Sequence, residues 1–296
     1  MDTRAIFMGL AFAFMWSSAF TSARIIVADA SPLFSLALRF LISGLLGVII
    51  ALLMGQSLRL TRPQWIATLL FGLCQNALYL GLNFIAMQTV EAGLATIIAS
   101  VMPLLVALAS WLILGERLRP LGFLGLILGF AGVGLIMSTR IGAGADLHGV
   151  ILCGFGVLAL TFATLAVRKA TSGGNFMMIV GLQMLVGAAL LFIAAPLTEE
   201  FHITLSPRWI AAFAYTTLVP GLAATYVWVL LLHRIGATRA ATFHFLNPVF
   251  GVAIAAALLG ERLGSLDLVG VLIVTAGILA VQLARQPAPA AVPTKD

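Results

Sequence analysis

The second half of this 296-residue chain repeats its first half at an offset of 145 residues, which carries Pro103 onto Pro248. At the same offset the Gly-Glu-Arg-Leu tetrapeptide of residues 115–118 recurs at 260–263. Each copy is built almost entirely of apolar segments and is too long to be one unit of a solenoid. A duplicated bundle of membrane helices is typical of transporters, whose substrate site lies between the two copies.

The composition supports a membrane protein. Hydrophobic residues make up 62% of the chain and charged residues 9%, and the mean hydropathy is +1.14. Most apolar stretches reach the roughly 17–25 residues that a membrane helix needs. We therefore predict an all-α integral membrane protein of ten transmembrane helices, arranged as two inverted five-helix repeats. The predicted spans are 4–27, 33–54, 65–88, 92–114, 120–138, 148–168, 176–195, 209–232, 237–259 and 266–284.

The same pattern sets the domain boundaries and the orientation. The first repeat covers 1–147 and the second 148–285, and the Pro- and Ala-rich tail 286–296 is expected to be disordered. Both termini are expected in the cytoplasm, because only Arg24, Arg140, Arg208 and Arg262 then lie outside. Five is an odd number of spans, so the second copy enters the membrane inverted. Inverted repeats supply two related conformations, which is a basis for alternating access.

Other function classes are not favoured by the sequence. The net charge of +6 does not indicate nucleic-acid binding, because the arginines lie singly between apolar spans. Cys74 and Cys153 lie within apolar spans, which favours neither a disulfide nor a metal site. We expect no cofactor, no metal and no enzyme activity, since paired carboxylates within one span and the common hydrolase motifs are missing. An integral membrane enzyme and a passive scaffold remain the alternatives from other classes.

A family resemblance sharpens this interpretation. The ten spans, the doubled Pro…Leu-Gly-Glu-Arg-Leu signature at 103–118 and 248–263, and the Trp-Ser-Ser-Ala-Phe segment at 16–20 resemble the EamA-type families of the drug/metabolite transporter superfamily. The chain looks most like the YddG group of bacterial inner-membrane exporters, associated with amino acids, particularly aromatic ones, and with methyl viologen. The resemblance implies a central cavity lined by spans 1, 3, 4, 6, 8 and 9.

Polar side chains within membrane spans are costly, so each is a candidate for function. In the third span, Asn76, Tyr79 and Asn83 have spacings that place them on one face of an α-helix. Amides and hydroxyls can orient the ammonium and carboxylate of a zwitterion, and aromatic rings can hold its apolar part. Hydrogen bonding between helices is the alternative role. The further candidates for substrate binding are Trp16, Ser17, Ser18, Ser100, Thr161, Trp228, Phe243, His244 and Asn247.

For two groups, one titratable and one charged, the sequence allows two roles each. His244 can take up a proton near neutral pH, or it can be a neutral ring bonded to a neighbouring helix. Arg39 can bind a substrate carboxylate, or its long side chain can reach the external interface. Asp and Glu are missing from the middle of every span, which argues against proton antiport and against a carrier dedicated to organic cations.

The repeated signature itself is interpreted as structural. Gly115 and Gly260 are expected to end helices in the left-handed conformation, and Glu116 and Glu261 to favour the positive N-terminus of the next helix. The prolines 103 and 248 are expected to loosen their helices, and we class Pro103 and Pro248 with these turns as hinge residues.

The sequence thus predicts a bacterial inner-membrane exporter of small amphipathic metabolites, most plausibly amino acids, that works by alternating access between the repeats. Efflux of multiple drugs or quaternary cations such as methyl viologen is the alternative. The expected partners are a small-molecule substrate and the lipid bilayer, with no nucleic acid. A functional monomer is expected, because five plus five spans can build a complete pathway in one chain.

Overall fold

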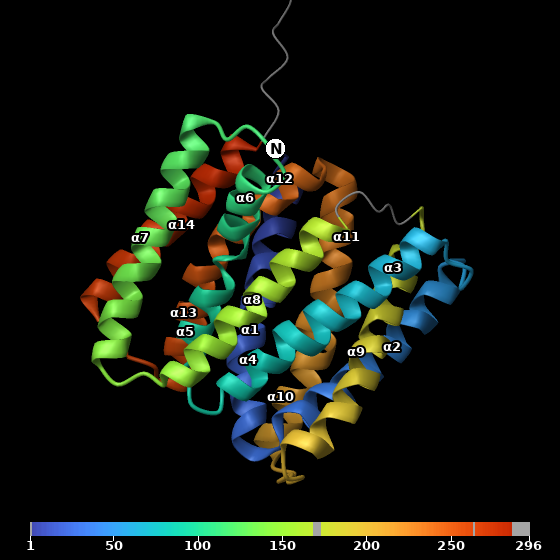
Figure 1. The fold of residues 1–296 in the computed structure, drawn as a ribbon. Coiled ribbons are helices and arrows are strands. Elements are labelled where there is room, and N and C mark those ends of the chain that lie inside the picture. The colour runs from blue at the N-terminus through green and yellow to red at the C-terminus, as the bar shows by residue number, and fades with distance from the viewer. Residues whose placement is uncertain (1, 168–172, 263, 286–296) are drawn as a thin grey trace, which may run out of the picture.

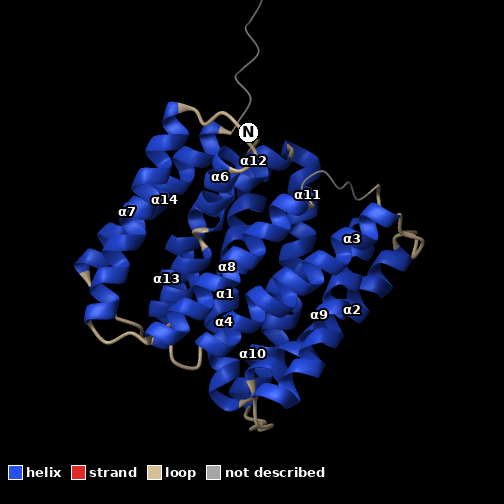
Figure 2. Ribbon diagram, viewed as in Figure 1, coloured by secondary structure: helices blue, strands red, loops and turns tan. Residues whose placement is uncertain are grey.

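The computed structural model describes residues 2–167, 173–262 and 264–285, which form a helical bundle (Figure 1). Within these residues, ten helical stretches are long and apolar enough to cross a membrane, which confirms the predicted fold class. The loops lie mainly at the two ends of the bundle (Figure 2). The tail 286–296 lies outside the described residues.

Six of the ten spans are single helices. They are α1 (Thr3–Asp29), α2 (Pro32–Leu53), α7 (Pro120–Gly142), α8 (Leu147–Ala166), α9 (Phe176–Thr198) and α14 (Ser265–Ala284), which form spans 1, 2, 5, 6, 7 and 10.

The other four spans are interrupted. Span 3 runs through α3 (Arg62–Phe71), the π-helix η1 (Gly72–Leu80) and α4 (Gly81–Ala86). Span 8 runs through α10 (Pro207–Leu218), the π-helix η2 (Val219–Ala223) and α11 (Ala224–Ile235). Span 4 consists of α5 (Ala92–Ala99) and α6 (Met102–Leu112), and span 9 of α12 (Ala237–Thr242), the 3-10 helix η3 (Phe243–Leu246) and α13 (Asn247–Leu259).

The interruptions correspond between the repeats. The 145-residue offset carries the π-helix of span 3 onto that of span 8, and the break between α5 and α6 onto η3. Pro103 and Pro248 follow closely on the breaks of spans 4 and 9, and Pro220 lies within the π-helix of span 8. Each lacks the N–H that would continue the helical ladder. Irregular backbone at membrane depth is tolerated only where protein covers it. The interrupted spans accordingly lie between two outer pairs of regular helices.

These outer pairs frame the bundle. Helices α7 and α14 pack along one edge and α2 and α9 along the other (Figure 1). In the first pair, a Cβ atom on Gly132 would lie 2.8 Å from the Val274 backbone nitrogen and 2.9 Å from the Gly270 carbonyl oxygen. Glycine is therefore required for the close approach of these helices. Since each pair joins one helix from each repeat, the repeats are bound together along both edges.

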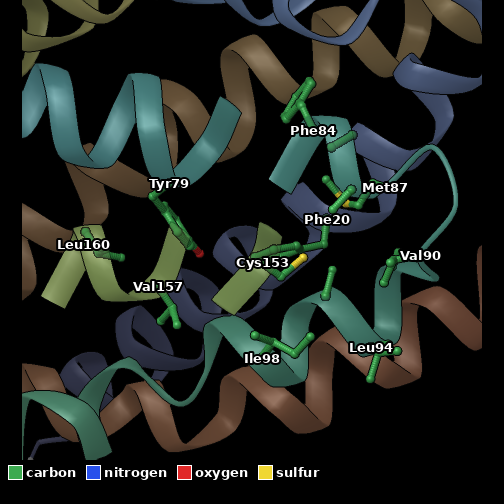
Figure 3. Packing of buried hydrophobic residues seen from close by; sticks show 14 of the residues in the cluster. Phe20, Tyr79, Phe84, Met87, Val90, Leu94, Ile98, Cys153, Val157 and Leu160 are labelled. Carbon is green, nitrogen blue, oxygen red and sulfur yellow. The ribbon is translucent and has the colours of Figure 1, made fainter. Parts of the chain in front are cut away.

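The main apolar core lies between the outer pairs. Phe20, Tyr79, Ile98, Cys153 and Val157 belong to it and come from four different helical segments (Figure 3). Both cysteines are free and buried.

Both ends of the described chain lie at one end of the bundle, which we call the terminal end. There the Arg234 guanidinium binds the Asp2 carboxylate at 2.6 Å, and this hydrogen bond lowers the pKa of Asp2. Glu116 and Arg285 border one surface hollow of about 390 Å³ at the same end. Helix α1 starts at the terminal end, whereas α8 starts at the opposite end, so the two repeats are inverted.

The α7–α14 contact gives a stability prediction with a control on the same helix. We expect Gly132→Ala to lower the free energy of unfolding by about 1–3 kcal/mol, because its methyl group meets backbone atoms that cannot move aside. A Cβ on Gly134 meets no atom within 4 Å, so Gly134→Ala should leave stability unchanged or raise it by up to about 1 kcal/mol. Thermal unfolding of both purified variants measures the difference; equal melting temperatures would contradict the proposed close contact.

Candidate functional site

A small cavity of about 50 Å³ lies where spans 1, 3, 4, 6 and 9 meet. It is bordered by both the break between α5 and α6 and the 3-10 segment of span 9, one from each repeat. The lining residues are Trp16, Ser17, Phe20, Tyr79, Thr96, Ala99, Ser100, Met102, Pro103, Leu160, His244 and Asn247.

Asn247 is the centre of the polar side of this cavity. Its Oδ1 and its backbone carbonyl accept from the Ser17 hydroxyl at 3.5 and 3.3 Å. Its Nδ2 lies 3.0 Å from Nδ1 of His244. With the amide in this orientation, Nδ1 of His244 is the acceptor, so the ring is neutral and carries its proton on Nε2. Span 1 of the first repeat is thereby hydrogen-bonded to span 9 of the second.

Aromatic rings gather beside His244. Phe12 stacks at a tilt on Trp228 with ring centroids 4.6 Å apart, and it meets Trp16 at 5.7 Å. The His244 ring meets both Phe12 and Trp228 edge-on at 5.3 Å. Of this aromatic cluster of Phe12, Trp16, Trp228 and His244, only Trp16 and His244 line the cavity, and the other two rings pack against them. The faces of such rings carry negative potential.

Tyr79 borders the cavity from span 3. It is 4% exposed, its ring points toward α8, and its hydroxyl has no hydrogen bond to another described residue (Figure 3). Ser100, at the break in span 4, donates to the Thr96 carbonyl at 2.7 Å. The hydroxyl of Tyr79 is thus an unused donor and acceptor beside the cavity, whereas that of Ser100 is engaged as a donor.

Six of the twelve predicted site residues line the cavity, namely Trp16, Ser17, Tyr79, Ser100, His244 and Asn247. The other six do not line it. Trp228 belongs to the aromatic cluster, and Phe243 packs against Gly9. Ser18 binds the Tyr215 hydroxyl at 2.8 Å, and Thr161 donates to the Val157 carbonyl at 2.8 Å.

The remaining two, Asn76 and Asn83, do not line the cavity that Tyr79 borders. Asn76 packs against Gly187 of α9 and donates to the Gln183 carbonyl at 2.8 Å. Asn83 donates to the Tyr79 carbonyl at 2.7 Å. Asn83 lies in α4 and, like Tyr79, is close to Gly156 of α8. The expectation of one common face assumed α-helical winding, but Asn76 and Tyr79 lie in the π-helix 72–80, whose wider turn changes which residues align. Asn76 therefore has the interhelical role that was the alternative.

The repeated glutamate has a role different from the one expected. Gly115 and Gly260 do adopt positive φ angles of 65° and 69°, as predicted. Glu261, however, does not bind the start of the following helix α14. Its two carboxylate oxygens accept from the Ala92 and Gly93 N–H groups at 2.7 and 2.9 Å, at the start of α5. The glutamate of the second repeat thus caps a helix of the first, which only the tertiary structure could reveal.

An ion-pair network beside this cap was missed by the sequence analysis. Arg140, at the end of α7, binds Glu91 at 2.5 Å and Asp267 of α14 at 3.0 Å. It also donates to the Arg262 carbonyl at 3.3 Å. Charged residues at helix ends gave no signal of pairing, since their partners lie 49 and 127 positions away in sequence. Together with Glu261, Arg140 joins the two repeats at the end opposite the termini.

Several cavity residues were also missed. Phe20, Thr96, Ala99, Met102 and Leu160 line the cavity although none was a candidate. Phe20 lies three and four residues from Ser17 and Trp16, so helical spacing could have identified it. Among the described residues, no group of three or more His, Cys, Asp and Glu is placed to hold a metal ion.

The Glu261 cap gives a pH-dependent prediction. Burial raises the pKa of Glu261 above its usual value of 4.5, against the opposing effect of its backbone hydrogen bonds. A raised pKa means that the folded protein binds this proton more tightly than the unfolded protein does. The protonated carboxyl therefore stabilises the folded state at any pH below the pKa of the unfolded state. This stabilisation is lost as the pH rises through the pKa of the folded state. The stability difference between wild type and Glu261→Gln should therefore decrease from about pH 4.5 upward.

The size of the effect can be checked at neutral pH. We expect Glu261→Gln to remain less stable than wild type by about 1–3 kcal/mol there, because the amide offers only one acceptor to two N–H groups. Thermal unfolding across a pH series measures both quantities. A stability difference that increased with pH would contradict the prediction.

Comparisons with known proteins agree with the architecture. The model of the EamA-like transporter family matches residues 3–138 and again 147–283. An uncharacterized transporter of Bacillus subtilis, YvbV, is 30% identical over 89% of this chain and 87% of its own length. An uncharacterized inner membrane transporter of Escherichia coli, YedA, is 27% identical over 93% of this chain and 90% of its own. A solved crystal structure superimposes with a TM-score of 0.69 over 96% of this chain and 98% of its own at 22% identity, which supports the fold alone. The chain is a multi-pass membrane transporter and belongs to the EamA-like transporter family.

Proposed function

We propose that this transporter exports small amphipathic metabolites, amino acids including aromatic ones, across the bacterial inner membrane by alternating access. The observation that carries the proposal is the cavity at the two helix breaks, one from each repeat. Helix breaks at the interface of inverted repeats are where transporters bind substrate. The relative named an inner membrane transporter supports the location. The assignment of amino acids as the substrate comes from the resemblance of the sequence to the YddG group.

The chemistry of the cavity suits a zwitterion with an apolar side chain. Asn247, Ser17 and the Tyr79 hydroxyl supply donors and acceptors without a net charge. Trp16 and His244, the two members of the aromatic cluster that line the cavity, supply rings for an apolar or aromatic group, and the Trp16 ring can also attract an ammonium. A neutral site of this kind can satisfy both charges of an amino acid through hydrogen bonds.

The cavity must enlarge to hold such a solute. Its volume of about 50 Å³ is far below the roughly 300 Å³ at which ligand pockets begin. We infer that the interrupted spans bend around the cavity, with Pro103 and Pro248 as hinges, while the outer pairs α2–α9 and α7–α14 stay packed. Opening at the end opposite the termini then requires release of Glu261 from α5 and of Arg140 from its two carboxylates. If the termini are cytoplasmic, as the Lys and Arg distribution predicts, this end faces outward.

Transport is proposed to need neither a cofactor nor a second copy of the chain. The cavity is formed by helices of one chain, in keeping with a functional monomer. His244 is neutral in its hydrogen-bonded arrangement, and an acidic side chain is missing from the cavity lining. We therefore favour facilitated flux over proton antiport.

Efflux of quaternary cations such as methyl viologen is the second candidate. The aromatic cluster favours it, because ring faces attract cations that cannot form hydrogen bonds. The lack of a carboxylate in the cavity lining counts against it, since such a cation would have no counter-charge. Competition between methyl viologen and phenylalanine for the carrier distinguishes the two candidates.

The first test is uptake of radiolabelled phenylalanine into protein-containing liposomes, with and without a pH gradient. We expect uptake without a gradient and a loss of about tenfold or more in Tyr79→Ala, since one well-placed aromatic contact with a polar tip contributes about 1–2 kcal/mol. Tyr226→Ala is the matched control, because Tyr226 is 48% exposed on the membrane-spanning helix α11. It should keep wild-type uptake.

Each other outcome has a definite meaning. Uptake that requires the gradient would replace the facilitative mechanism with proton coupling and point to His244. Equal loss in the two tyrosine variants would remove Tyr79 from the site. Equal phenylalanine uptake by protein-containing and empty liposomes would overturn the amino-acid assignment. Methyl viologen would then be tested. If neither solute is transported, a passive scaffold is favoured.

A further inference from the structure

Arg39 is a buried cation in the first half of the membrane-spanning helix α2. Its side chain is 5% exposed, although it lies only about 10 Å along the helix from Pro32. A long cationic side chain at that depth usually reaches the headgroups. Here the guanidinium does not reach the headgroups. A Cβ atom on Gly221 in η2 would lie 3.7 Å from Nη2 of Arg39. The same Cβ atom would lie 3.3 Å from the hydroxyl of Ser43, one turn further along α2. Arg39 therefore points toward the π-helix of span 8.

The guanidinium has no counter-charge among the described residues. It forms no ion pair or hydrogen bond with any of them, and its Nε is a buried donor without a partner. The Phe40 ring, 5.2 Å from the guanidinium carbon, is its neighbour through a cation–π contact. Arginine cannot release its proton in proteins, so the charge persists at this depth.

Two acidic side chains at the nearby helix ends are engaged elsewhere. Glu199 accepts from the Leu33 and Phe34 N–H groups at the start of α2, at 3.0 and 2.8 Å. Asp29 accepts from the Ser206 hydroxyl at 2.8 Å. Neither is placed to neutralise Arg39.

The surroundings of Arg39 are polar and also incompletely bonded. Helices α1, α2 and α10 contact one another, and η2 contacts both α1 and α2. The Ser35 hydroxyl, one turn before Arg39 on α2, and the Thr21 hydroxyl of α1 are both buried without a hydrogen-bond partner. Thr21 lies nine residues before Ala30 and Arg39 nine residues after it, so the two lie at one depth on antiparallel helices. Ser43 is engaged, since it donates to the Thr217 carbonyl at 3.3 Å.

We propose that Arg39 is the centre of an anion-binding site between spans 1, 2 and 8, separate from the central cavity, which takes a small monovalent anion. The guanidinium presents a planar fork that matches a carboxylate, and free hydroxyls can complete its hydrogen bonds. The anion is either a free ion or the carboxylate of a transported solute. Only the second source rests on the proposed function.

The site is tested by the thermal unfolding of the purified protein in sodium acetate, sodium chloride and sodium gluconate at one ionic strength. Acetate and chloride are small enough to enter, whereas gluconate is a bulky monovalent control. A ligand that binds only the folded protein stabilises it, and we expect melting temperatures about 2–4 °C higher in acetate or chloride than in gluconate. Arg39→Gln should abolish this difference.

Two further variants keep the test decisive. Arg208→Gln removes an exposed arginine at the start of α10 and should keep the full anion dependence. Arg39→Lys retains the charge without the fork and should show a smaller dependence, which also serves if Arg39→Gln does not fold. Wild-type melting temperatures that are equal in all three salts, or an anion dependence retained in Arg39→Gln, would overturn the proposal.

The source of the anion is found by adding phenylalanine or phenethylamine, which lacks the carboxylate, in gluconate. Stabilisation by phenylalanine alone, lost in Arg39→Gln, assigns the site to the solute's carboxylate; stabilisation by chloride and acetate alone assigns it to a free ion. Failure of the site is distinct from failure of the transport proposal. Phenylalanine flux without any anion effect overturns only the site, and an anion effect without flux overturns only the amino-acid assignment.

Discussion

The need to satisfy every backbone polar group within the membrane is the constraint on which this structure depends. Regular helices meet it unaided, and they form the outer pairs α2–α9 and α7–α14. Interrupted helices meet it only where protein surrounds them. The π-helices of spans 3 and 8 and the breaks of spans 4 and 9 therefore lie between those pairs, and the small cavity lies where two of them meet.

The outer pairs and the interior have different physical roles. Gly132 and its neighbours bring α7 and α14 together so closely that a single methyl group would collide with backbone. Contacts of this kind are rigid. The interior instead joins the repeats through hydrogen bonds such as Ser17 to Asn247 and Glu261 to the start of α5, which can break one at a time. The motion proposed for transport is thus expected around the cavity.

Two buried or partly buried arginines differ in whether they have a counter-charge. At the end opposite the termini, Arg140 has two carboxylate partners and holds α7, α14 and the start of α5 together. Arg39, deep in the bundle, has none among the described residues. The ion pairs of Arg140 stabilise one conformation. The unpaired charge of Arg39 can be neutralised by an anion from outside the protein, as proposed above. A cation without a counter-charge at this depth is costly, which is why it is a candidate for function.

The sequence alone determined the class, the ten spans, the inverted repeat and the glycine turns at 115 and 260, because hydropathy, period and backbone preference are local properties. It also predicted six of the twelve residues that line the cavity, mostly by the rule that polar groups in spans are costly. It could not predict which residues Asn76 contacts, because residues 72–80 form a π-helix and not the expected α-helix. Nor could it find that Glu261 caps a helix 169 positions away. Only tertiary packing decides which backbone N–H a carboxylate reaches and which face a distorted helix presents, since both depend on segments far apart in the chain.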